Sequence, residues 1–488
     1  MTADPGQKTH LSIATGELLS PYGLDIRTLE AALSHLMSRR IDYGDLYLQK
    51  TTSESWRMEN GIVAPTKKTS NLGLGARAMV SERTAYAFTR VLEKKSILNT
   101  VSTARSISSR VANGALCIRE ITRPRRHYPP ANPMEHTPDA DKISILEHLE
   151  EMARMQNPKV GRVATKLSSV YQVILIVNSD GNLAVDVRPL FGIQISVSIN
   201  SDSKFGEGYA ALSRRTLLSS SVDTSTLNSL AREAVRTASV DLAGVPVAGG
   251  QFPVVLGSGA AGSLVHESIG HGLEADFNLN GESVFSSKLG ERVADSQCTI
   301  VDDGTLEEER GSLSIDDEGS PARQTVLIEN GRLANYMHDI RSARLLGMMA
   351  TGNGRRESFT HTLLPRMTNT YLLPGKYDTS EILRSVDKGI YARKLRGGRV
   401  DIASGKFALS AGEAYLIEKG KVTQPLKNLT LVGDGSTALS RISLVGNDLQ
   451  FDPGVGSCRK AGQIVPIGAG QPTVKIDRLL CFSSRLRP

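Results

Sequence analysis

The opening part of the chain contains two hydrophobic patterns. Residues 25–40 and 94–107 repeat apolar side chains every three or four positions, which is the spacing of one helical face. Residues 43–49 and 84–88 alternate apolar and polar side chains, as in strands with one face exposed. Because helical and strand patterns follow one another here, we expect an N-terminal α/β domain over residues 1–120.

A second region of mixed pattern follows a break at residues 121–138. This stretch holds five prolines and three arginines, a composition that continues neither a helix nor a strand and predicts a linker. Beyond it lie a helical pattern and an apolar run within residues 168–178, and Asp180-Gly181 predicts a hairpin turn. A further helical pattern near 224–240 closes a second α/β domain, which we place at residues 139–245.

Strand and turn signals dominate the rest of the chain, residues 250–488. Pairs such as Asp303-Gly304 and Asn330-Gly331 are typical of hairpin turns, and glycines are frequent throughout. We therefore expect an α+β fold, with mixed α/β N-terminal domains followed by a strand-rich, glycine-rich catalytic domain.

Composition narrows the class of protein. The 488 residues are 40% apolar, enough for large cores, and the net charge of +7 comes with an ordinary 22% of charged residues and no recognisable nucleic-acid-binding module. No apolar run approaches the about 18 residues of a membrane span, and no signal-peptide pattern opens the sequence. These features predict a cytoplasmic protein without membrane or nucleic-acid partners.

The chemistry is concentrated in residues 253–276, where a strand and a glycine-rich turn precede His266, Glu267 and His271. Catalytic zinc takes three protein ligands and leaves one position for a water, whose proton a carboxylate removes. The two histidines would be ligands and Glu267 the base. Their i, i+5 spacing sets the rings about 140° apart on an ideal α-helix. We therefore predict an irregular helix, either with a π-bulge or ending near the glycines that follow Ile269.

Other interpretations of this stretch are weaker. Gly257, Gly259 and Gly262 follow an apolar strand, as in a dinucleotide fingerprint, but the second strand and acid expected about 20 residues later are missing. Phosphate-binding loops are also absent, because Pro374-Gly375-Lys376 lacks the upstream glycine and the following Ser or Thr. For an isolated short motif, two surface histidines beside a glutamate would be the simplest explanation.

A zinc site would need a third ligand from elsewhere in the chain. His338 and His361 lie in the same region, and either could be a structural histidine. Cys458 lies near several glycines and beside Arg459 and Lys460, whose charges favour the thiolate that binds metal. Chemistry alone favours Cys458 over His338 without excluding the latter.

Longer segments resemble the TldD/PmbA family of metalloproteases almost from end to end. The matching segments are Arg40-Ile-Asp-Tyr-Gly-Asp-Leu-Tyr, His266-Glu-Ser-Ile-Gly-His-Gly-Leu-Glu-Ala-Asp-Phe, Ile315-Asp-Asp-Glu-Gly, Thr351-Gly-Asn-Gly-Arg-Arg-Glu-Ser, Pro365-Arg-Met-Thr-Asn-Thr and Val455-Gly-Ser-Cys. Such long matches are far more specific than the paired histidines.

The resemblance implies a metal-dependent peptidase with one divalent ion, Zn²⁺, held by His266, His271 and Cys458, with Glu267 as general base. It also implies a heterodimer with a TldE/PmbA-like subunit. Family members are linked to leader-segment removal from modified peptide antibiotics and to degradation of an antitoxin, and they take in unfolded peptides as an extended strand. An exposed sheet edge suits that mode of binding.

Substrate contacts are expected from four further residues. Asn353, Arg355 and Arg356 are candidates to stabilise the oxyanion. Arg459 stands where the family usually has glycine, so a cation there could meet a peptide carboxylate. The alternatives are a non-catalytic regulator linked to DNA gyrase and a peptide-binding chaperone with a bystander metal site.

Overall fold

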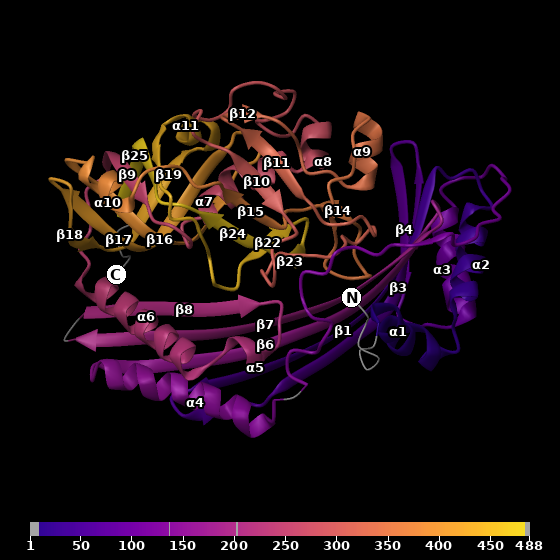
Figure 1. The fold of residues 1–488 in the computed structure, drawn as a ribbon, viewed down its shortest axis with the longest axis horizontal. Helices are drawn as coiled ribbons and strands as arrows, with labels where there is room; N and C mark the ends of the chain where they lie inside the picture. The colour runs from indigo at the N-terminus through magenta and orange to yellow at the C-terminus, as the bar shows by residue number, and fades with distance from the viewer. Residues whose placement is uncertain (1–8, 136, 202–203, 484–488) are drawn as a thin grey trace.

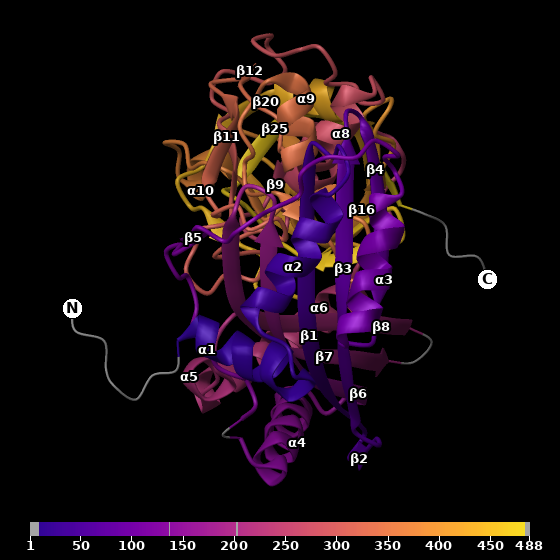
Figure 2. The same ribbon diagram turned by 90° about the vertical axis from the view of Figure 1, so that its right-hand side faces the viewer.

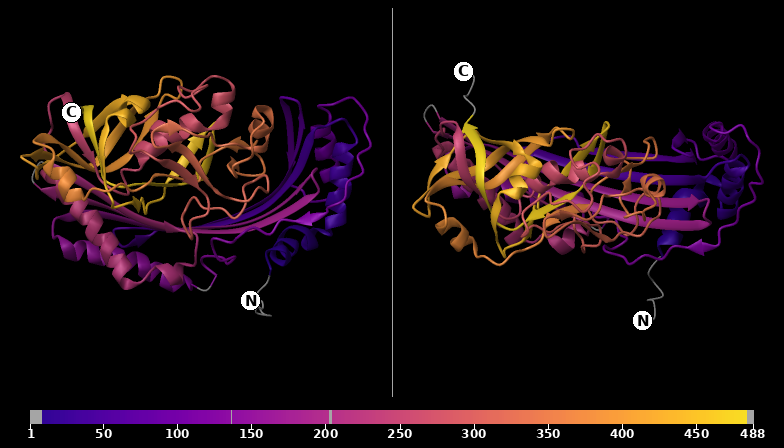
Figure 3. Two further views of the ribbon diagram at one scale, coloured as in Figure 1. Left: turned by 45° about the horizontal axis from the view of Figure 1, so that its top comes forward. Right: turned by 90° about the horizontal axis from the view of Figure 1, so that it is seen from above.

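A computed structural model describes residues 9–135, 137–201 and 204–483 (Figure 1). The first half of the chain builds one long curved sheet with helices on its outer face. The second half forms a strand-rich body that lies on the inner, concave side of this sheet (Figure 3). The expected α+β fold is confirmed, with mixed α/β structure followed by a strand-rich C-terminal part.

The first sheet has eight strands in the order β4-β3-β1-β6-β7-β5, with β2 beside β1 and β8 beside β7. Its strands are β1 (Tyr43–Glu59), β2 (Ile62–Val63), β3 (Lys67–Val80), β4 (Arg83–Thr89), β5 (Glu120–Ile121), β6 (Val160–Asn178), β7 (Asn182–Ser201) and β8 (Lys204–Arg214). Strands β1 and β6, from either side of the expected linker, pair antiparallel. Asp45 lies opposite Asn178 at one end of the pairing, and Glu59 lies opposite Ala164 at the other. One sheet therefore contains strands of both predicted N-terminal domains, and the boundaries stay a prediction.

Helices cover the outer face at both ends of the sheet, where the sequence patterns predict them. Helices α2 (Ile26–Met37) and α3 (Lys94–Arg105) pack together against β1, β3 and β4 (Figure 2). At the other end, α4 (Asp139–Gln156) and α6 (Thr224–Ala243) pack against each other and against β6, β7 and β8. Asp25 caps α2 by accepting a 2.8 Å hydrogen bond from the Thr28 amide, which stabilises the first turn.

Two glycines allow α6 to pack closely on β8. A Cβ atom at Gly208 would clash with the carbonyl oxygen of Ala234, and one at Gly206 would clash with that of Ala238. The backbones of helix and strand therefore touch where a side chain would normally separate them. Helix α6 is thereby fixed beside the edge of the sheet that faces the C-terminal body.

The C-terminal body contains a seven-stranded sheet and a six-stranded sheet. In the first, β16, β9, β25, β19 and β17 close into a ring because β16 also pairs with β17. The strands of this sheet are β9 (Gly250–Leu256), β16 (Lys388–Val400), β17 (Lys406–Glu418), β18 (Lys421–Leu426), β19 (Leu429–Asp434), β20 (Ile442–Val445) and β25 (Val474–Ser483). The second has the order β12-β11-β10-β15-β24-β21, with β10 (Ile300–Asp303), β11 (Gln324–Glu329), β12 (Arg332–Leu333), β15 (Asn369–Leu372), β21 (Gln450–Phe451) and β24 (Gly468–Gln471).

Short elements complete the fold. Two hairpins, β13–β14 and β22–β23, are formed by β13 (Gly354–Arg355), β14 (Leu364–Pro365), β22 (Ser457–Lys460) and β23 (Gln463–Pro466). The short helices are α1 (His10–Ala14), α5 (Leu218–Ser221), α7 (Ser263–Val265), α8 (Ala275–Leu279), α9 (Ile340–Leu346), α10 (Thr379–Arg384) and α11 (Gly435–Ser440). No helix of the described residues is long and apolar enough to cross a membrane.

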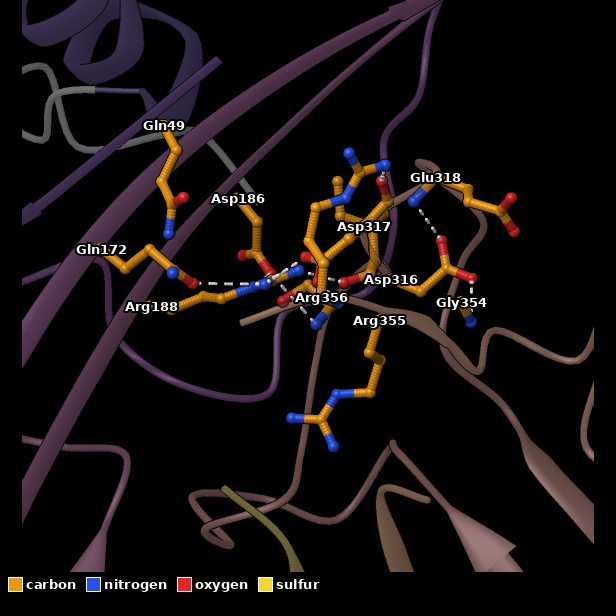
Figure 4. Close-up of polar contacts among 12 residues, drawn as sticks. Gln49, Gln172, Asp186, Arg188, Asp316, Asp317, Glu318, Gly354, Arg355 and Arg356 are labelled. Carbon is orange, nitrogen blue, oxygen red and sulfur yellow. Dashed lines mark hydrogen bonds and ion pairs between the residues drawn. The ribbon is translucent and has the colours of Figure 1, made fainter. Parts of the chain in front are cut away.

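A buried polar cluster joins the sheet to the C-terminal body, and it contains the conspicuous Asp316-Asp-Glu segment (Figure 4). Arg188 on β7 contacts Asp317 at 2.6 Å and Gln172 at 3.2 Å. Arg77 on β3 contacts Glu318 at 2.7 Å. Because the charges are paired across the interface, the cluster fixes the position of the C-terminal body on the sheet.

Candidate metal centre

The histidine motif lies on one continuous but irregular helical segment. Helix α7 is followed by a π-helical turn, His266–Gly270, and then by a 3₁₀ turn, His271–Leu273. The His271 amide donates to the carbonyl of His266, the i+5 to i bond of a π-helix, and this stacks the two residues on one face. The ring centroids are 5.1 Å apart. The predicted irregularity is therefore confirmed.

The glycines of the motif allow close packing and do not adopt unusual dihedral angles. Gly270 has φ −52° and ψ −53°, an ordinary helical conformation, but a Cβ atom there would clash with the Met367 side chain. A Cβ atom at Gly272 would approach the Phe285 ring to 2.7 Å. The π-helical turn is thus pressed against its neighbours on two sides, which holds the histidines in place.

Cys458 meets this turn from the opposite end of the domain. It lies on β22, and its Sγ atom is 3.6 Å from Nε2 of His271. One donor atom each of His266, His271 and Cys458 lies within 4.8 Å of the other two. Tetrahedral zinc with ordinary Zn–N and Zn–S bond lengths would place such donors about 3.6 Å apart. The donor set, its spacing and its burial therefore fit a divalent ion of the zinc type.

The electrostatics favour the thiolate of Cys458. Burial acts to raise the pKa of the thiol, but the hydrogen bonds with His266 and His271 outweigh it and lower the pKa from 9.0 to about 5. Burial likewise acts to lower the pKa of His271, but the Glu274 carboxylate and the Cys458 sulfur raise it well above its usual value. Together the two shifts describe a Cys458 thiolate beside a protonated His271, and a metal ion bound here would take the place of the imidazole proton.

Glu267 occupies a different position from the three donors. It is half-buried and, together with His266, lines a cavity of about 1120 Å³ between the first sheet and the C-terminal body. Strand β8, helix α6, strand β16 and the segment 450–457 supply most of the remaining wall. A carboxylate that faces an open cavity beside a cation site is placed to exchange protons with a bound molecule.

His338 and His361 lie outside this cluster. His338 is fully buried, lies just before α9 instead of within a helix, and its ring contacts Ser342 at 3.3 Å. His361 contacts the Ser358 hydroxyl at 2.9 Å. Among the described residues, the possible metal-binding group consists of His266, His271 and Cys458.

The structure places Asn353, Arg355 and Arg356, the expected substrate contacts, as buried side chains outside the residues that line the cavity. Asn353 donates to Asp302 at 2.8 Å. Arg356 donates from its backbone amide to Asp317 at 2.8 Å and from Nη1 to the Tyr86 hydroxyl at 3.0 Å. The Arg355 side chain points away from the polar cluster (Figure 4), and Nη2 donates to the carbonyl of Pro466 at 2.8 Å. These three side chains support the framework.

Arg459 also lies outside the cavity lining, although its neighbour Cys458 is buried. Side chains alternate along a strand, so consecutive residues of β22 point to opposite faces. Arg459 is exposed on the face opposite to Cys458. The Arg459 side chain therefore points away from Cys458, and its contact with a substrate stays a prediction.

Sequence reasoning missed Glu274 and Arg366, and it gave Lys460 only the role of favouring the Cys458 thiolate. Glu274 is fully buried and lies 3.1 Å from Nδ1 of His271, which fixes the ring orientation. Lys460 lies 3.1 Å from the same carboxylate, and together with Arg366 and His271 it lowers the pKa of Glu274 to about 2 against the effect of burial. The i, i+3 spacing from His271 to Glu274 was the one local signal available.

Comparison with known proteins gives a consistent result. Models of the PmbA/TldA metallopeptidase family match as domain 1 over residues 44–108, central domain over 132–242 and C-terminal domain over 249–481. The metalloprotease TldD homolog of Haemophilus influenzae is 43% identical over 476 residues, covering 96% of this chain and 98% of the relative. A metalloprotease of Methanocaldococcus jannaschii is 30% identical over 448 residues, covering 89% and 96%.

Solved structures share the fold at lower identity. TldE from Thermococcus kodakarensis has a TM-score of 0.71 and 18% identity, covering 94% of this chain and 99% of that one. A Thermotoga maritima protein, described as a candidate modulator of a DNA gyrase, has a TM-score of 0.75 and 20% identity, covering 90% and 96%. These structures support the architecture, and the matches in sequence identify the family. The chain belongs to the PmbA/TldD family of metallopeptidases.

Proposed function

We propose that this protein is a metal-dependent peptidase in which His266, His271 and Cys458 hold one divalent ion, Zn²⁺, and Glu267 is the general base. The observation that carries the proposal is the convergence of three buried donor atoms within 4.8 Å, beside a carboxylate that lines a cavity. Membership of a metallopeptidase family supports the same assignment.

The chain's own groups account for the proton transfers of amide hydrolysis. A zinc ion bound by these donors would supply a Lewis acid that makes water acidic and the peptide carbonyl electrophilic. Glu267 accepts a proton from the water while the water oxygen attacks the carbonyl carbon. It then delivers this proton to the amine nitrogen as the C–N bond breaks. The second proton of the water stays on the new carboxyl group, so the products are one carboxylic acid and one amine, which ionise to a carboxylate and an ammonium. Glu267 ends in its starting state.

The edge of β8 supports an extended peptide as the substrate. The backbone amide of Ser213 donates to the carbonyl of Pro453, and the backbone amide of Glu207 donates to the Asp241 carboxylate. The main-chain amide and carbonyl groups of the odd-numbered residues of β8 therefore point away from β7. Tyr209 and Ala211 lie between them and line the cavity. Within the described part of the chain, their outward amide and carbonyl groups have no main-chain partner, so an extended peptide can pair with them.

We further propose a TldE/PmbA-like subunit as partner and the cytoplasm as the site of action. The similarity to a protein named TldE and the family itself support this assembly. Unfolded leader segments and labile antitoxins are the proposed types of substrate, because recognition through main-chain groups makes little demand on peptide sequence.

The test uses the full chain co-expressed with a PmbA-like subunit and an unstructured peptide, with products identified by mass spectrometry. Wild-type protein should cleave the peptide. Glu267→Gln should retain metal and peptide binding while cleavage falls by about 10²–10⁴-fold, because the proton acceptor is lost. Unchanged cleavage in Glu267→Gln would reject the base. Peptide binding without cleavage by the metal-loaded wild-type complex would favour the chaperone or regulator.

A further inference from the structure

Arg366 lies between the two segments that carry His271 and Cys458. Its side chain is fully buried, at 0% exposure, and Nη2 donates to the carbonyl oxygen of Cys458 at 2.7 Å. Its Nε atom lies 3.9 Å from Oε1 of Glu274, whose other oxygen lies 3.1 Å from Nδ1 of His271. One guanidinium therefore contacts the main chain of one proposed ligand and the carboxylate that orients another.

Lys460 strengthens the same connection from the hairpin side. It is two residues beyond Cys458 on β22, so both side chains lie on one face of the strand. Its Nζ atom lies 3.1 Å from Glu274 and donates at 3.1 Å to the carbonyl of Pro365, the residue before Arg366. Glu274 is thus held both by the hairpin that carries Cys458 and by the segment that carries Arg366.

Burying the Arg366 guanidinium costs free energy of folding, which is not expected of a residue whose only role is to stabilise the fold. A buried guanidinium loses its hydration, and well-packed apolar side chains often replace buried ions without loss of stability. Nε and Nη1 of Arg366 have no hydrogen-bond partner among the described residues. A buried charge that is incompletely satisfied and directed at two ligand-bearing segments indicates a role in the site.

Two neighbouring arginines, one buried and one half-buried, lack this bridging geometry. Arg355 and Arg310 also donate to carbonyls around the hairpin, at Pro466 and Gly456, with distances of 2.8 and 2.7 Å. Among the described residues, no hydrogen bond or ion pair joins either of them to Glu274 or to the carbonyl of Cys458. They hold the hairpin, whereas Arg366 links it to the histidine-bearing turn.

We propose that Arg366 is a positioning residue that fixes Cys458 and His271 relative to each other before an ion binds. This inference rests on the proposed metal site. Donors that are already in place lose less conformational freedom on binding, so the affinity for the ion is higher. Residues that orient metal ligands typically contribute about 10–100-fold to metal affinity. Arg366 would also keep the Cys458 sulfur directed toward the ion.

The test compares full-length Arg366→Met and Arg366→Lys with a matched control, Arg215→Met. Arg215 is also buried, at 3% exposure, and donates to the carbonyls of Arg310 and Pro189, but it contacts neither ligand-bearing segment. Three quantities are measured on each protein: the melting temperature without metal, the Zn²⁺ affinity by competition with a chelator, and the thiolate-to-Co²⁺ charge-transfer band per bound cobalt.

Arg366→Met should lower Zn²⁺ affinity by about 10–100-fold and weaken the cobalt band, because Cys458 is no longer held toward the ion. Arg366→Lys keeps the charge but cannot reach both partners, so its affinity should fall at least several-fold. Arg215→Met should lower the melting temperature but keep wild-type affinity and the full band. If Arg366→Met does not fold, the comparison of Arg366→Lys with Arg215→Met decides.

Wild-type affinity and a full cobalt band in a folded Arg366 variant would overturn the inference. Equal losses of affinity in Arg215→Met would also overturn it, since the effect would then follow general destabilisation. Failure of the wild-type protein to bind Zn²⁺ or Co²⁺ with Cys458 as a ligand would instead reject the proposed metal site itself. The two failures are therefore distinguishable.

Discussion

The Sγ atom of Cys458 lies 3.6 Å from Nε2 of His271, although 187 residues separate them in sequence. The contact joins a hairpin near the end of the chain to the 3₁₀ turn that directly follows the π-helical turn. His271 and Cys458 are both buried, and the packing around Gly270 and Gly272 leaves no space for larger side chains beside the histidines. The donor atoms are therefore arranged by the fold, and this arrangement leads to specific expectations.

Zinc should stabilise the chelator-treated protein. An ion that binds only the folded state at 100 times its Kd adds about 2.7 kcal/mol, so the melting temperature should rise on addition of Zn²⁺. Cys458→Ala should abolish most of this rise. Cys298→Ala is the matched control, because Cys298 is equally buried at 0% exposure but lies outside the donor cluster. An undiminished zinc-dependent rise in Cys458→Ala would reject the sulfur ligand.

Proline at residue 211 should weaken peptide cleavage without disrupting the sheet. The Ala211 amide points away from β7, so its loss removes a donor to the substrate and no ladder hydrogen bond. A single hydrogen bond of about 0.5–1.5 kcal/mol predicts a roughly 2- to 12-fold lower kcat/KM in Ala211→Pro. Ala211→Ser keeps the amide and should behave like wild type. Equal activity of both variants would argue against peptide pairing at β8.

Alanine at residue 208 should destabilise the packing of α6 on β8. The added methyl group would clash with the carbonyl of Ala234, and such overpacking typically costs about 1–3 kcal/mol. Gly16→Ala is the control, because no atom lies within 4 Å of its added Cβ and its φ is not positive. Denaturant unfolding should show a lower free energy of unfolding for Gly208→Ala than for Gly16→Ala. Equal stabilities would contradict the close packing.

Acid should weaken the contact between α6 and β16. Burial acts to raise the pKa of Glu233, but hydrogen bonds from Arg236 and Lys394 outweigh it and lower the pKa from 4.5 to about 2. A depressed pKa means that this group stabilises the fold above about pH 4.5, and that its contribution is lost as the pH falls toward 2. Glu233→Gln should therefore be less stable than wild type at pH 7, and the difference should shrink on acidification.

The measurement for this prediction is the melting temperature from pH 7 down to the lowest pH at which both proteins remain folded. Glu151→Gln is the control, because Glu151 is an exposed acid on α4. Its effect should be small at every pH. A Glu233→Gln deficit that stays constant with pH would show that the ion pairs with Arg236 and Lys394 do not supply the stabilisation.

Local features could be predicted from sequence because they depend on neighbouring residues. The apolar spacing in residues 25–40 and 224–240 identified α2 and α6, since a helical face is repeated within one turn. The i, i+5 spacing of His266 and His271 predicted a π-helical or otherwise broken turn, since an ideal helix would separate the rings. Long matching segments also identified the family, which the comparisons confirmed.

The sequence by itself thus determined the order of helices and strands, the candidate histidines and base, and the family. Only the tertiary structure brought Cys458 instead of His338 to the histidines, buried Asn353 and Arg356 away from the cavity, and placed Arg366 between the ligand-bearing segments. Periodicity records the dihedral angles of adjacent residues. Contacts between distant residues depend instead on strand register and on the packing of whole layers, which no local pattern contains.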